Sequence, residues 1–291
     1  MLDTKLKIGL PKGSLQNATV DLFKRAGYTV QVSSRSYFPT IDDPSFEAVL
    51  FRAQEMSRYV EDGIIDLGLT GHDWICENKS DVVEVCQLTY SKATAKPAKW
   101  VLAVPAESGI DKPEQLEGGI IATELVNVTE QYFKEKGIKV KVEFSWGATE
   151  VKARLLDGIV EITETGSSLR ANNLKIIDEL MISTTRLIAN KAAWADPAKR
   201  DKIEALALML QSAIEGREKL GLKFNLPADK LNDAVGILPA AKSPTVSHLA
   251  DNNFVALEVI IEESDSRTLI PQLKKIGASG IFTYALNQVI A

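Results

Sequence analysis

The sequence lacks the features that would assign it to a membrane, to an export pathway or to a metal centre. It has no run of about 18 apolar residues, the length that a helix needs to cross a bilayer. Its first residues enter a strand-like alternation without the regions of an export signal, so we expect a cytoplasmic protein. Its two cysteines are too few for a disulfide framework, and we expect neither to lie near a histidine with metal-ligand spacing.

A basic stripe is also absent, and the net charge of -5 argues against a nucleic-acid partner. What is present is ordinary for a globular protein, with 45% apolar and 25% charged residues. The chain of 291 residues is long enough for two or three compact units.

Two stretches of the chain resemble each other, which indicates a duplicated α/β lobe. NATVDLFKRAGYTVQV at 17–32 and NVTEQYFKEKGIKVKV at 127–142 share Asn, Thr, Phe, Lys, Gly and two Val at constant spacing. Each is typical of a helix ended by a glycine and followed by a strand. A second pair, DGIIDLGLTG at 62–71 and DGIVEITETG at 157–166, predicts a strand that ends in a Thr-Gly turn before a helix in each lobe.

The alternative is that unrelated amphipathic helices look alike. If the duplication is real, the strand-like segments 99–105 and 183–190 would cross between the lobes, and a ligand would bind in the cleft. The predicted division is 1–98 with 184–205 for lobe I, 99–183 for lobe II, 206–220 for a linker helix and 221–291 for a tail domain.

The tail alternates in the order βαββαβ, which is typical of a ferredoxin-like unit. We expect strands at 222–226, near 243–248, at 254–262 and at 280–285, and helices at 228–236 and near 265–276. Pro271 should delay or kink the second helix. The apolar strand from 254 looks buried on both faces, which would suit pairing with another subunit.

The stretch VEITETGSSLRANN at 160–173 places two acids beside hydroxyls and a glycine. Backbone N–H groups and hydroxyls around Gly166 would accept a phosphate. Acids would repel a bare phosphate, but they suit a phosphorylated ribose with hydroxyls and a Mg²⁺-bound pyrophosphate. The alternative is structural: Ser and Thr would cap a helix beginning near Leu169, with Glu164 at its positive end.

Several cations and one further turn are candidates for phosphate contacts. Lys12 follows a strand in a glycine turn that is not a Walker A motif, and Arg35 and Arg52 could clamp phosphates. Solvated lysines and surface salt bridges are the plain alternatives. Asp73 is the expected lobe I counterpart of Ser168, and two distant histidines argue against a histidine-based catalytic pair.

With these residues in view, the chain resembles the long form of the ATP phosphoribosyltransferase family over nearly its whole length. The matching motifs are LPKGSL at 10–15, Arg-Ala-Gln at 52–54, DLGLTGHD at 66–73, EITETGSSLRANNL at 161–174, LPAAKSPTVSHLAD at 238–251 and IGASGI at 276–281. The resemblance implies two lobes like periplasmic binding proteins and a ferredoxin-like, ACT-like regulatory domain. It also implies a homo-oligomer, a dimer or hexamer.

The reaction implied by the resemblance joins ATP and phosphoribosyl pyrophosphate, with Mg²⁺, to give N1-(5-phosphoribosyl)-ATP and pyrophosphate, under feedback inhibition by L-histidine. By matching positions, Glu161 would bind ribose or the metal, and the 5-phosphate would lie on Glu164, Thr165, Gly166, Ser167 and Ser168. ATP or pyrophosphate would contact Lys12, Gly13, Arg35, Arg52, Gly71, Asp73, Glu150 and Arg154. Histidine would bind at Ser243, Thr245 and Ala278.

Two departures qualify this transfer of roles: Ser14 stands where the family often has arginine, and Met56-Ser57 replace a commoner Val-Pro. From the residues alone, two rival functions remain. One is a solute-binding protein with the same two-lobed cleft, and the other is a cytoplasmic sensor whose cleft binds a nucleotide without catalysis.

Overall fold

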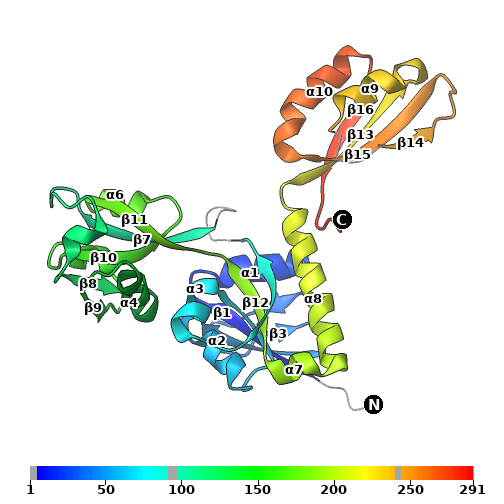
Figure 1. Ribbon diagram of the computed structural model, residues 1–291. Helices are drawn as coiled ribbons and strands as arrows, with labels where there is room; N and C mark the ends of the chain where they lie inside the picture. The colour runs from blue at the N-terminus through cyan, green and yellow to red at the C-terminus, as the bar shows by residue number, and fades with distance from the viewer. Residues whose placement is uncertain (1–4, 91–96, 240–243, 291) are drawn as a thin grey trace. The chain divides into compact units, whose positions relative to one another are not determined.

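The computed structural model describes residues 5–90, 97–239 and 244–290, and the chain forms two compact units. The first unit is Met1–Ala207 and the second is Leu208–Ala291, so the boundary falls within a long helix, α8 (Pro197–Glu215). This helix overlaps the linker helix predicted at 206–220, but it begins earlier, at Pro197, and it ends at Glu215 because the next strand already begins at Lys219. Figure 1 shows the elements of both units.

Lobe I of the first unit is built on a five-stranded sheet with the order β4-β1-β5-β12-β6. Its elements are β1 (Leu6–Lys12), α1 (Gln16–Arg25), β2 (Val30–Gln31), β3 (Thr40–Ile41), β4 (Phe46–Arg52), α2 (Ala53–Glu61), β5 (Leu67–Gly71), α3 (His72–Asn78), β6 (Val83–Leu88), β12 (Thr185–Ala189) and α7 (Lys191–Ala195). Met56 and Val60 of α2, Ile75 of α3 and Ile188 of β12 pack together in its core.

Lobe II is built on a second five-stranded sheet with the order β11-β7-β10-β8-β9. Its elements are β7 (Ala98–Pro105), the 3₁₀-helix η1 (Pro113–Leu116), β8 (Ile120–Thr123), α4 (Val126–Glu135), β9 (Lys141–Phe144), α5 (Thr149–Lys152), β10 (Gly158–Thr163), α6 (Ser167–Ala171) and β11 (Leu174–Ser183). Its core contains Trp100, Leu102, Ile121, Phe133 and Val160.

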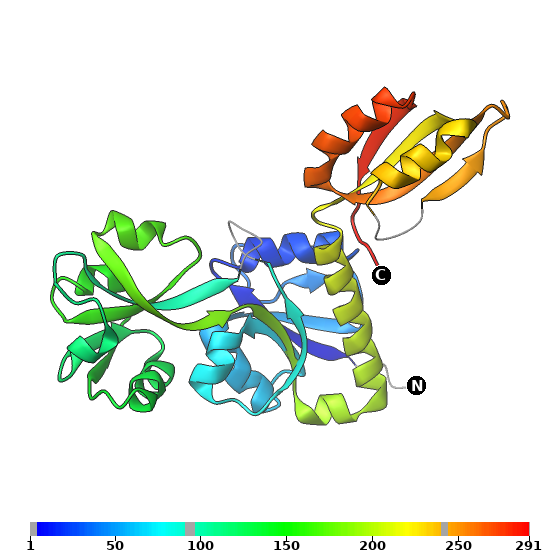
Figure 2. The same cartoon turned by 45° about the horizontal axis from the view of Figure 1, so that its top comes forward.

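The two sheets have the same topology, which confirms the predicted duplication. In lobe I, β1 pairs in parallel with β4 and β5, and β5 pairs antiparallel with β12; in lobe II, β8 pairs in parallel with β9 and β10, and β10 pairs antiparallel with β7. The outer strand is β6 in lobe I and β11 in lobe II, each antiparallel to its neighbour. Figures 1 and 2 show the chain passing from one sheet to the other where β11 leads into β12.

The first pair of similar stretches, 17–32 and 127–142, contains the equivalent helices α1 and α4, and both helices end in the same way. Gly27 after α1 and Gly137 after α4 have φ of 93° and 72°. The next residues, Tyr28 and Ile138, donate backbone hydrogen bonds to the carbonyls of Phe23 and Phe133. This arrangement satisfies carbonyls at the helix end and favours glycine, which tolerates a positive φ.

The predicted pairing of 62–71 with 157–166 was wrong in its alignment. The equivalent residues are Asp66 and Asp157: each N–H donates to the first lobe strand, at Lys7 O and Ile120 O, and each carboxylate accepts from the N–H of the same residue. Asp62 instead caps the end of α2. The match between 62–71 and 157–166 rests on Asp-Gly-Ile occurring both at a helix end and at a strand start.

This correction reveals a loop that only lobe II has. Helix α3 begins six residues after Asp66, whereas α6 begins ten residues after Asp157, so the lobe II connection is four residues longer. Gly71 is extended, with φ -72°, and leads directly into α3, so the Thr-Gly turn expected in lobe I is absent. Gly166 has φ 70° and lies in the loop between β10 and α6.

The second unit is a four-stranded antiparallel sheet with the order β14-β15-β13-β16, which is the ferredoxin-like topology predicted. After α8 come β13 (Lys219–Pro227), η2 (Ala228–Lys230), α9 (Leu231–Ile237), β14 (Thr245–His248), β15 (Phe254–Glu262), η3 (Glu263–Asp265), α10 (Ser266–Lys275) and β16 (Ser279–Ala285). Pro271 lies inside α10, which is not delayed. Of β15, Ile260 is 48% exposed, so burial on both faces was wrong for that end of the strand.

Candidate active site

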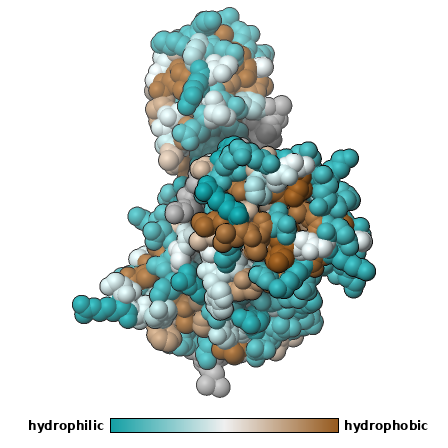
Figure 3. Space-filling model, turned by 90° about the vertical axis from the view of Figure 1, so that its left-hand side faces the viewer, coloured by the Kyte–Doolittle hydropathy of each residue, from teal (hydrophilic) through white to brown (hydrophobic). Residues whose placement is uncertain are grey.

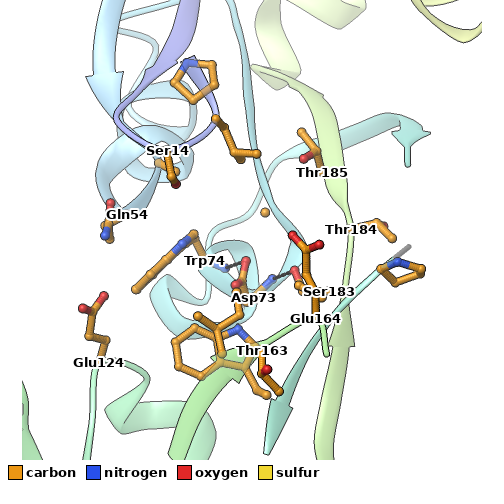
Figure 4. A pocket seen from close by; sticks show the side chains of 18 of the residues that line it. Ser14, Gln54, Asp73, Trp74, Glu124, Thr163, Glu164, Ser183, Thr184 and Thr185 are labelled. Carbon is orange, nitrogen blue, oxygen red and sulfur yellow. Dashed lines mark hydrogen bonds between the residues drawn. The ribbon is translucent and has the colours of Figure 1, made fainter. Parts of the chain in front are cut away.

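A cavity of about 800 Å³ lies between the two lobes of the first unit, so the predicted cleft is present. This volume suits a ligand of nucleotide size or larger. The lining includes Lys12, Ser14, Arg52, Gln54, Gly71, Asp73 and Trp74 from lobe I, Glu124, Glu161, Thr163, Glu164, Thr165, Ser167 and Ser168 from lobe II, and Ser183, Thr184 and Thr185 at the crossing. Figure 4 shows Asp73 and Trp74 between the turn that carries Ser14 and the strand that carries Thr185.

Two cations line the lobe I wall. Lys12 and Arg52 are paired in register at the ends of the parallel strands β1 and β4. Lys12 Nζ lies 3.5 Å from the centroid of the Tyr37 ring. Its hydrogen bond and its charge lower the pKa of Tyr37. Gly13, with φ 110°, turns the chain here, and a side chain at this position would meet the Arg52 guanidinium. The wall is suited to an anion such as a phosphate group.

The lobe II wall is the loop between β10 and α6, and its hydroxyl groups are ordered by one another. The N–H of Gly166 donates to Thr163 Oγ1 at 2.7 Å, and Thr165 Oγ1 donates to Ser167 Oγ at 3.0 Å. Ser168 Oγ donates to Glu150 at 2.6 Å. Helix α6 begins at Ser167, and its N-cap residue Gly166 has no side chain. The hydroxyls of Thr163 and Thr165 instead accept the N–H groups of Gly166 and Ser167, so the structural alternative of hydroxyls at the helix start is present beside the predicted anion site.

Glu161 is the most perturbed acid of this wall. Burial raises its pKa to about 7, and the charges of Glu150 and Glu124 add to the effect, while hydrogen bonds from Thr149 and the Ile162 N–H oppose it. A carboxyl group that titrates near neutral pH in a cavity is typical of a functional position. Its charge therefore depends on the pH in the neutral range.

We expect Glu161→Gln to raise the thermal unfolding midpoint at pH 8 and to leave it nearly unchanged at pH 4. The folded-state pKa of Glu161 lies above its unfolded value, so its contribution to stability is complete below the unfolded pKa and is lost as the pH rises through about 7. At pH 4, below the unfolded value of 4.5, the carboxyl is protonated in the folded state and largely protonated in the unfolded state, and glutamine resembles it. Differential scanning calorimetry of both proteins at the two pH values checks this. An equal midpoint at pH 8 would contradict the burial of a charged Glu161.

Asp73 lies on the floor of the cavity and is only 2% exposed. Its carboxylate accepts a hydrogen bond from the indole N–H of Trp100 at 2.7 Å and one from the Trp74 N–H at 3.0 Å. Its own N–H donates to Ser183 Oγ at 3.2 Å. Burial raises its pKa despite these bonds. Asp73 thus joins α3 to β7 and β11, in a role that its sequence position did not reveal.

Not every predicted residue lines the cavity. Gly13 and Gly166 belong to the turns of its walls, and Glu150 stands behind Ser168. Arg35 and Arg154 are exposed and are not among the lining residues. Sequence reasoning missed Glu124, Trp74, Trp100 and the segment Ser183-Thr184-Thr185, which joins β11 to β12. This segment could have been predicted as part of the site, because it places three consecutive hydroxyl residues between two strand-like stretches.

The expectation that neither cysteine lies near a histidine was wrong. His72 and Cys76 are one turn apart on α3, and Cys76 Sγ lies 3.5 Å from His72 Nε2. His72 Nδ1 is 3.4 Å from Glu84. Within residues 5–90, 97–239 and 244–290, however, no group of three or more His, Cys, Asp or Glu side chains could hold a metal ion. Mg²⁺ bound by one carboxylate and completed by substrate phosphates is compatible with this lining, with Glu161 as the candidate.

The fold and the site define an α/β protein with two lobes, a cavity between them that is lined by cations, acids and hydroxyl groups, and a ferredoxin-like tail. No helix in the described part of the chain is long and apolar enough to cross a membrane. The family model described as ATP phosphoribosyltransferase matches residues 52–212, and the model of its C-terminal domain matches 216–288. The chain belongs to the ATP phosphoribosyltransferase family of histidine biosynthesis, and the protein is a transferase of the phosphoribosyltransferase class.

Individual relatives agree with this assignment. The chain is 58% identical over 286 residues to the ATP phosphoribosyltransferase of Chlorobium phaeovibrioides, covering 98% of this chain and 97% of that one. It is 56% identical to the ATP phosphoribosyltransferase of Solibacter usitatus, covering 98% and 99%. Among solved structures, a chain of the ATP phosphoribosyl transferase (HisG:HisZ) complex from Thermotoga maritima is 29% identical, with a TM-score of 0.61 over 72% of this chain and 98% of that chain.

Proposed function

We propose that the protein transfers the phosphoribosyl group of phosphoribosyl pyrophosphate to N1 of ATP, giving N1-(5-phosphoribosyl)-ATP and pyrophosphate. The observation that carries the proposal is the cavity between the lobes. It brings the cations Lys12 and Arg52 of one wall together with the hydroxyl-rich loop and the acid Glu161 of the other. A substrate with phosphate at both ends and ribose hydroxyls between them matches this distribution of charge.

In this proposal the residues act by alignment and by charge neutralisation. The loop residues Glu164 to Ser168 hold the 5-phosphate, and Glu161 accepts from ribose hydroxyls or faces Mg²⁺. Lys12 and Arg52 neutralise the pyrophosphate as it departs, and Gly13 offers only its backbone at the turn beside them. Mg²⁺ supplies further positive charge to that pyrophosphate. The anomeric carbon becomes cationic in the transition state, so both orientation of the attacking adenine N1 and stabilisation of the developing charges contribute to the rate enhancement.

The remaining candidates have weaker support. Gly71 lines the cavity and Asp73 forms its floor, whereas Glu150 acts on the substrate only through Ser168. Arg35 and Arg154 are exposed outside the lining, so they reach ATP only if their segments move towards it. Both arginines are proposed ATP contacts on this condition.

The reaction is tested by mixing the protein with ATP, phosphoribosyl pyrophosphate and Mg²⁺. Release of pyrophosphate together with a new nucleotide supports the proposal. A folded protein that forms neither product disproves it. Omitting ATP is the control for simple hydrolysis. A two-lobed binding protein without catalysis, the rival from the sequence, would give substrate binding by calorimetry and no product.

We also propose that L-histidine inhibits the reaction by binding to the second unit. Of the three expected contacts, Ser243 lies outside the described residues, Thr245 is exposed on the edge strand β14, and Ala278 is 1% exposed in the core. The Ala278 side chain therefore packs between helix and sheet. Only the backbone of Ala278 could contact a ligand.

Thr245→Val should raise the histidine concentration needed for half-inhibition by about tenfold, because one hydroxyl contact is lost. Thr283→Val is the matched control, since Thr283 is exposed on β16 at the opposite edge of the same sheet. Initial rates measured over a range of L-histidine check both variants. Equal inhibition of wild type and Thr245→Val would remove Thr245 from the site.

We further propose that the protein forms a homo-oligomer and acts in the cytoplasm. Figure 3 shows apolar surface on the side of the molecule that includes lobe II. Phe144, Trp146, Val151 and Leu155, on and near β9 and α5, are between 50% and 92% exposed, and Phe144 stacks edge-on against Trp146. Exposed aromatic and aliphatic side chains at this density favour a protein interface.

A further inference from the structure

Helix α3 belongs to lobe I, where it follows strand β5, yet two of its acidic side chains accept hydrogen bonds from lobe II. Glu77 is 8% exposed, and its two carboxylate oxygens accept the backbone N–H groups of Asn127 and Val128, each at 3.0 Å. The Asn127 amide also donates to the Glu77 carbonyl at 3.0 Å. One turn earlier, Asp73 accepts from the Trp100 indole of lobe II.

Glu77 supplies a cap that α4 does not have in its own sequence. The N-cap residue of α4 is Leu125, which makes no side-chain cap, and the first turn contains no acid. The first N–H groups of a helix lack partners within the helix and carry its positive dipole end, so a carboxylate there is strongly favoured. Because this carboxylate comes from the other lobe, the bond fixes the lobes to each other.

The duplication shows what this contact changes. The equivalent helix in lobe I, α1, also begins after an uncapped leucine, Leu15, but there Ser14 and Leu15 line the cavity. The same helix start is therefore open to the cavity in lobe I and closed by Glu77 in lobe II. The lobe II copy is used for assembly of the two lobes.

The position of α3 allows its contact with α4 to restrict the relative motion of the two lobes. Two strand crossings alone join the lobes covalently, and such crossings allow rotation about a hinge. A third tie through α3 and α4 restricts that rotation. The Trp74 ring meets the Trp100 ring edge-on at 6.2 Å beside Asp73, which adds packing to the hydrogen bonds.

We propose that Asp73 and Glu77 are positioning residues that lock lobe II against lobe I, so that the walls of the cavity are held in register before the substrates bind. Neither acid needs to touch a reacting atom. Each wall binds mainly one part of the substrates, whereas the transition state requires both walls at the correct separation. Loss of the lock should therefore lower kcat more than it raises KM, an expectation that rests on the proposed reaction.

Glu77→Ala tests the lock, with Glu61→Ala as its matched control. Glu61 of α2 accepts the N–H of Asp81 at 3.0 Å, the same kind of bond within lobe I. We expect Glu77→Ala to lower kcat by about ten- to a hundredfold, with KM values within about threefold of wild type, because misalignment on the scale of 1 Å has effects of this size. Glu61→Ala should retain most of the wild-type kcat.

Amide hydrogen exchange supplies a readout that needs no substrate. The amides of Asn127 and Val128 should exchange at least about tenfold faster in Glu77→Ala and at the wild-type rate in Glu61→Ala, because only the first variant exposes them. Glu77→Gln keeps the shape and one acceptor, so it should fold if the alanine variant does not, and its kcat should be intermediate.

Three results would overturn the lock. Unchanged exchange at Asn127 and Val128 would show that the cap is not formed. Faster exchange with unchanged kcat would remove its positioning role, and an equal loss of kcat in both alanine variants would reduce the effect to general destabilisation. If the wild-type protein formed no product, the proposed reaction would fail while the exchange result still decided whether the cap forms.

Discussion

Gly166→Val is expected to lower kcat/KM for phosphoribosyl pyrophosphate by at least about a hundredfold. Gly166 has φ 70°, in the left-handed region that a β-branched residue avoids at a cost of roughly 1–2 kcal/mol. Its N–H donates to Thr163 Oγ1, and the neighbouring hydroxyls of Thr165 and Ser167 are ordered around it. Relief of the strain would move these groups away from a bound phosphate. Initial rates and isothermal titration with phosphoribosyl pyrophosphate measure the loss.

Gly109→Val separates the loop from the strain. Gly109 has φ 73°, is exposed in lobe II, and has nothing within 4 Å of the position that a Cβ would take. Both variants have the same backbone strain, and the nearest group to a Cβ at Gly166 is the flexible end of Arg170. The two should therefore have similar melting temperatures, while only Gly166→Val loses activity. If Gly166→Val kept wild-type activity, the phosphate would have to bind elsewhere.

Arg52→Gln is expected to lower kcat/KM by about a hundred- to a thousandfold. Arg52 is placed beside Lys12 by the register of β1 and β4, and both line the cavity. A charged contact to a departing phosphate group is worth about 3–4 kcal/mol when it strengthens in the transition state. Arg52→Lys keeps the charge but lacks the bidentate fork, so its rate should be intermediate.

Arg58→Gln is the matched control for this change. Arg58 lies on α2, six positions further along the chain, and is exposed outside the cavity lining. It removes the same charge from the same lobe, so an electrostatic effect at long range would lower both rates equally. Steady-state kinetics for both substrates measure the difference. An Arg52→Gln enzyme that retained more than a third of the wild-type kcat/KM would exclude Arg52 from the pyrophosphate site.

The positions of the elements were largely predictable because their signals are local. Gly27 and Gly137 end equivalent helices, and the six elements of the tail lie close to their expected bounds. The candidate residues on the two walls, Lys12, Arg52 and Glu161, were also predictable, since each directly follows or belongs to a strand whose end faces the cleft.

The alignment of the two lobes was wrong at a short motif that occurs in both lobes but in different structures. Asp-Gly-Ile at 62–64 ends a helix and enters a loop, whereas Asp-Gly-Ile at 157–159 starts a strand. Only the hydrogen bonds of Asp66 and Asp157 to equivalent strands reveal the true pairing and the four extra residues of the lobe II loop. A turn was therefore expected in lobe I where the strand leads directly into α3.

By itself, the sequence determined the fold class, the duplication, the family and the residue types of the two walls, because periodicity, glycine positions and motifs are properties of neighbouring residues. The tertiary structure alone decided the contacts of Asp73 and Glu77 with lobe II, the raised pKa of Glu161 and the exposure of Arg35 and Arg154. The physical reason is that burial and hydrogen bonding across about 50 residues, as between Glu77 and Asn127, depend on how the lobes pack and leave no pattern along the chain.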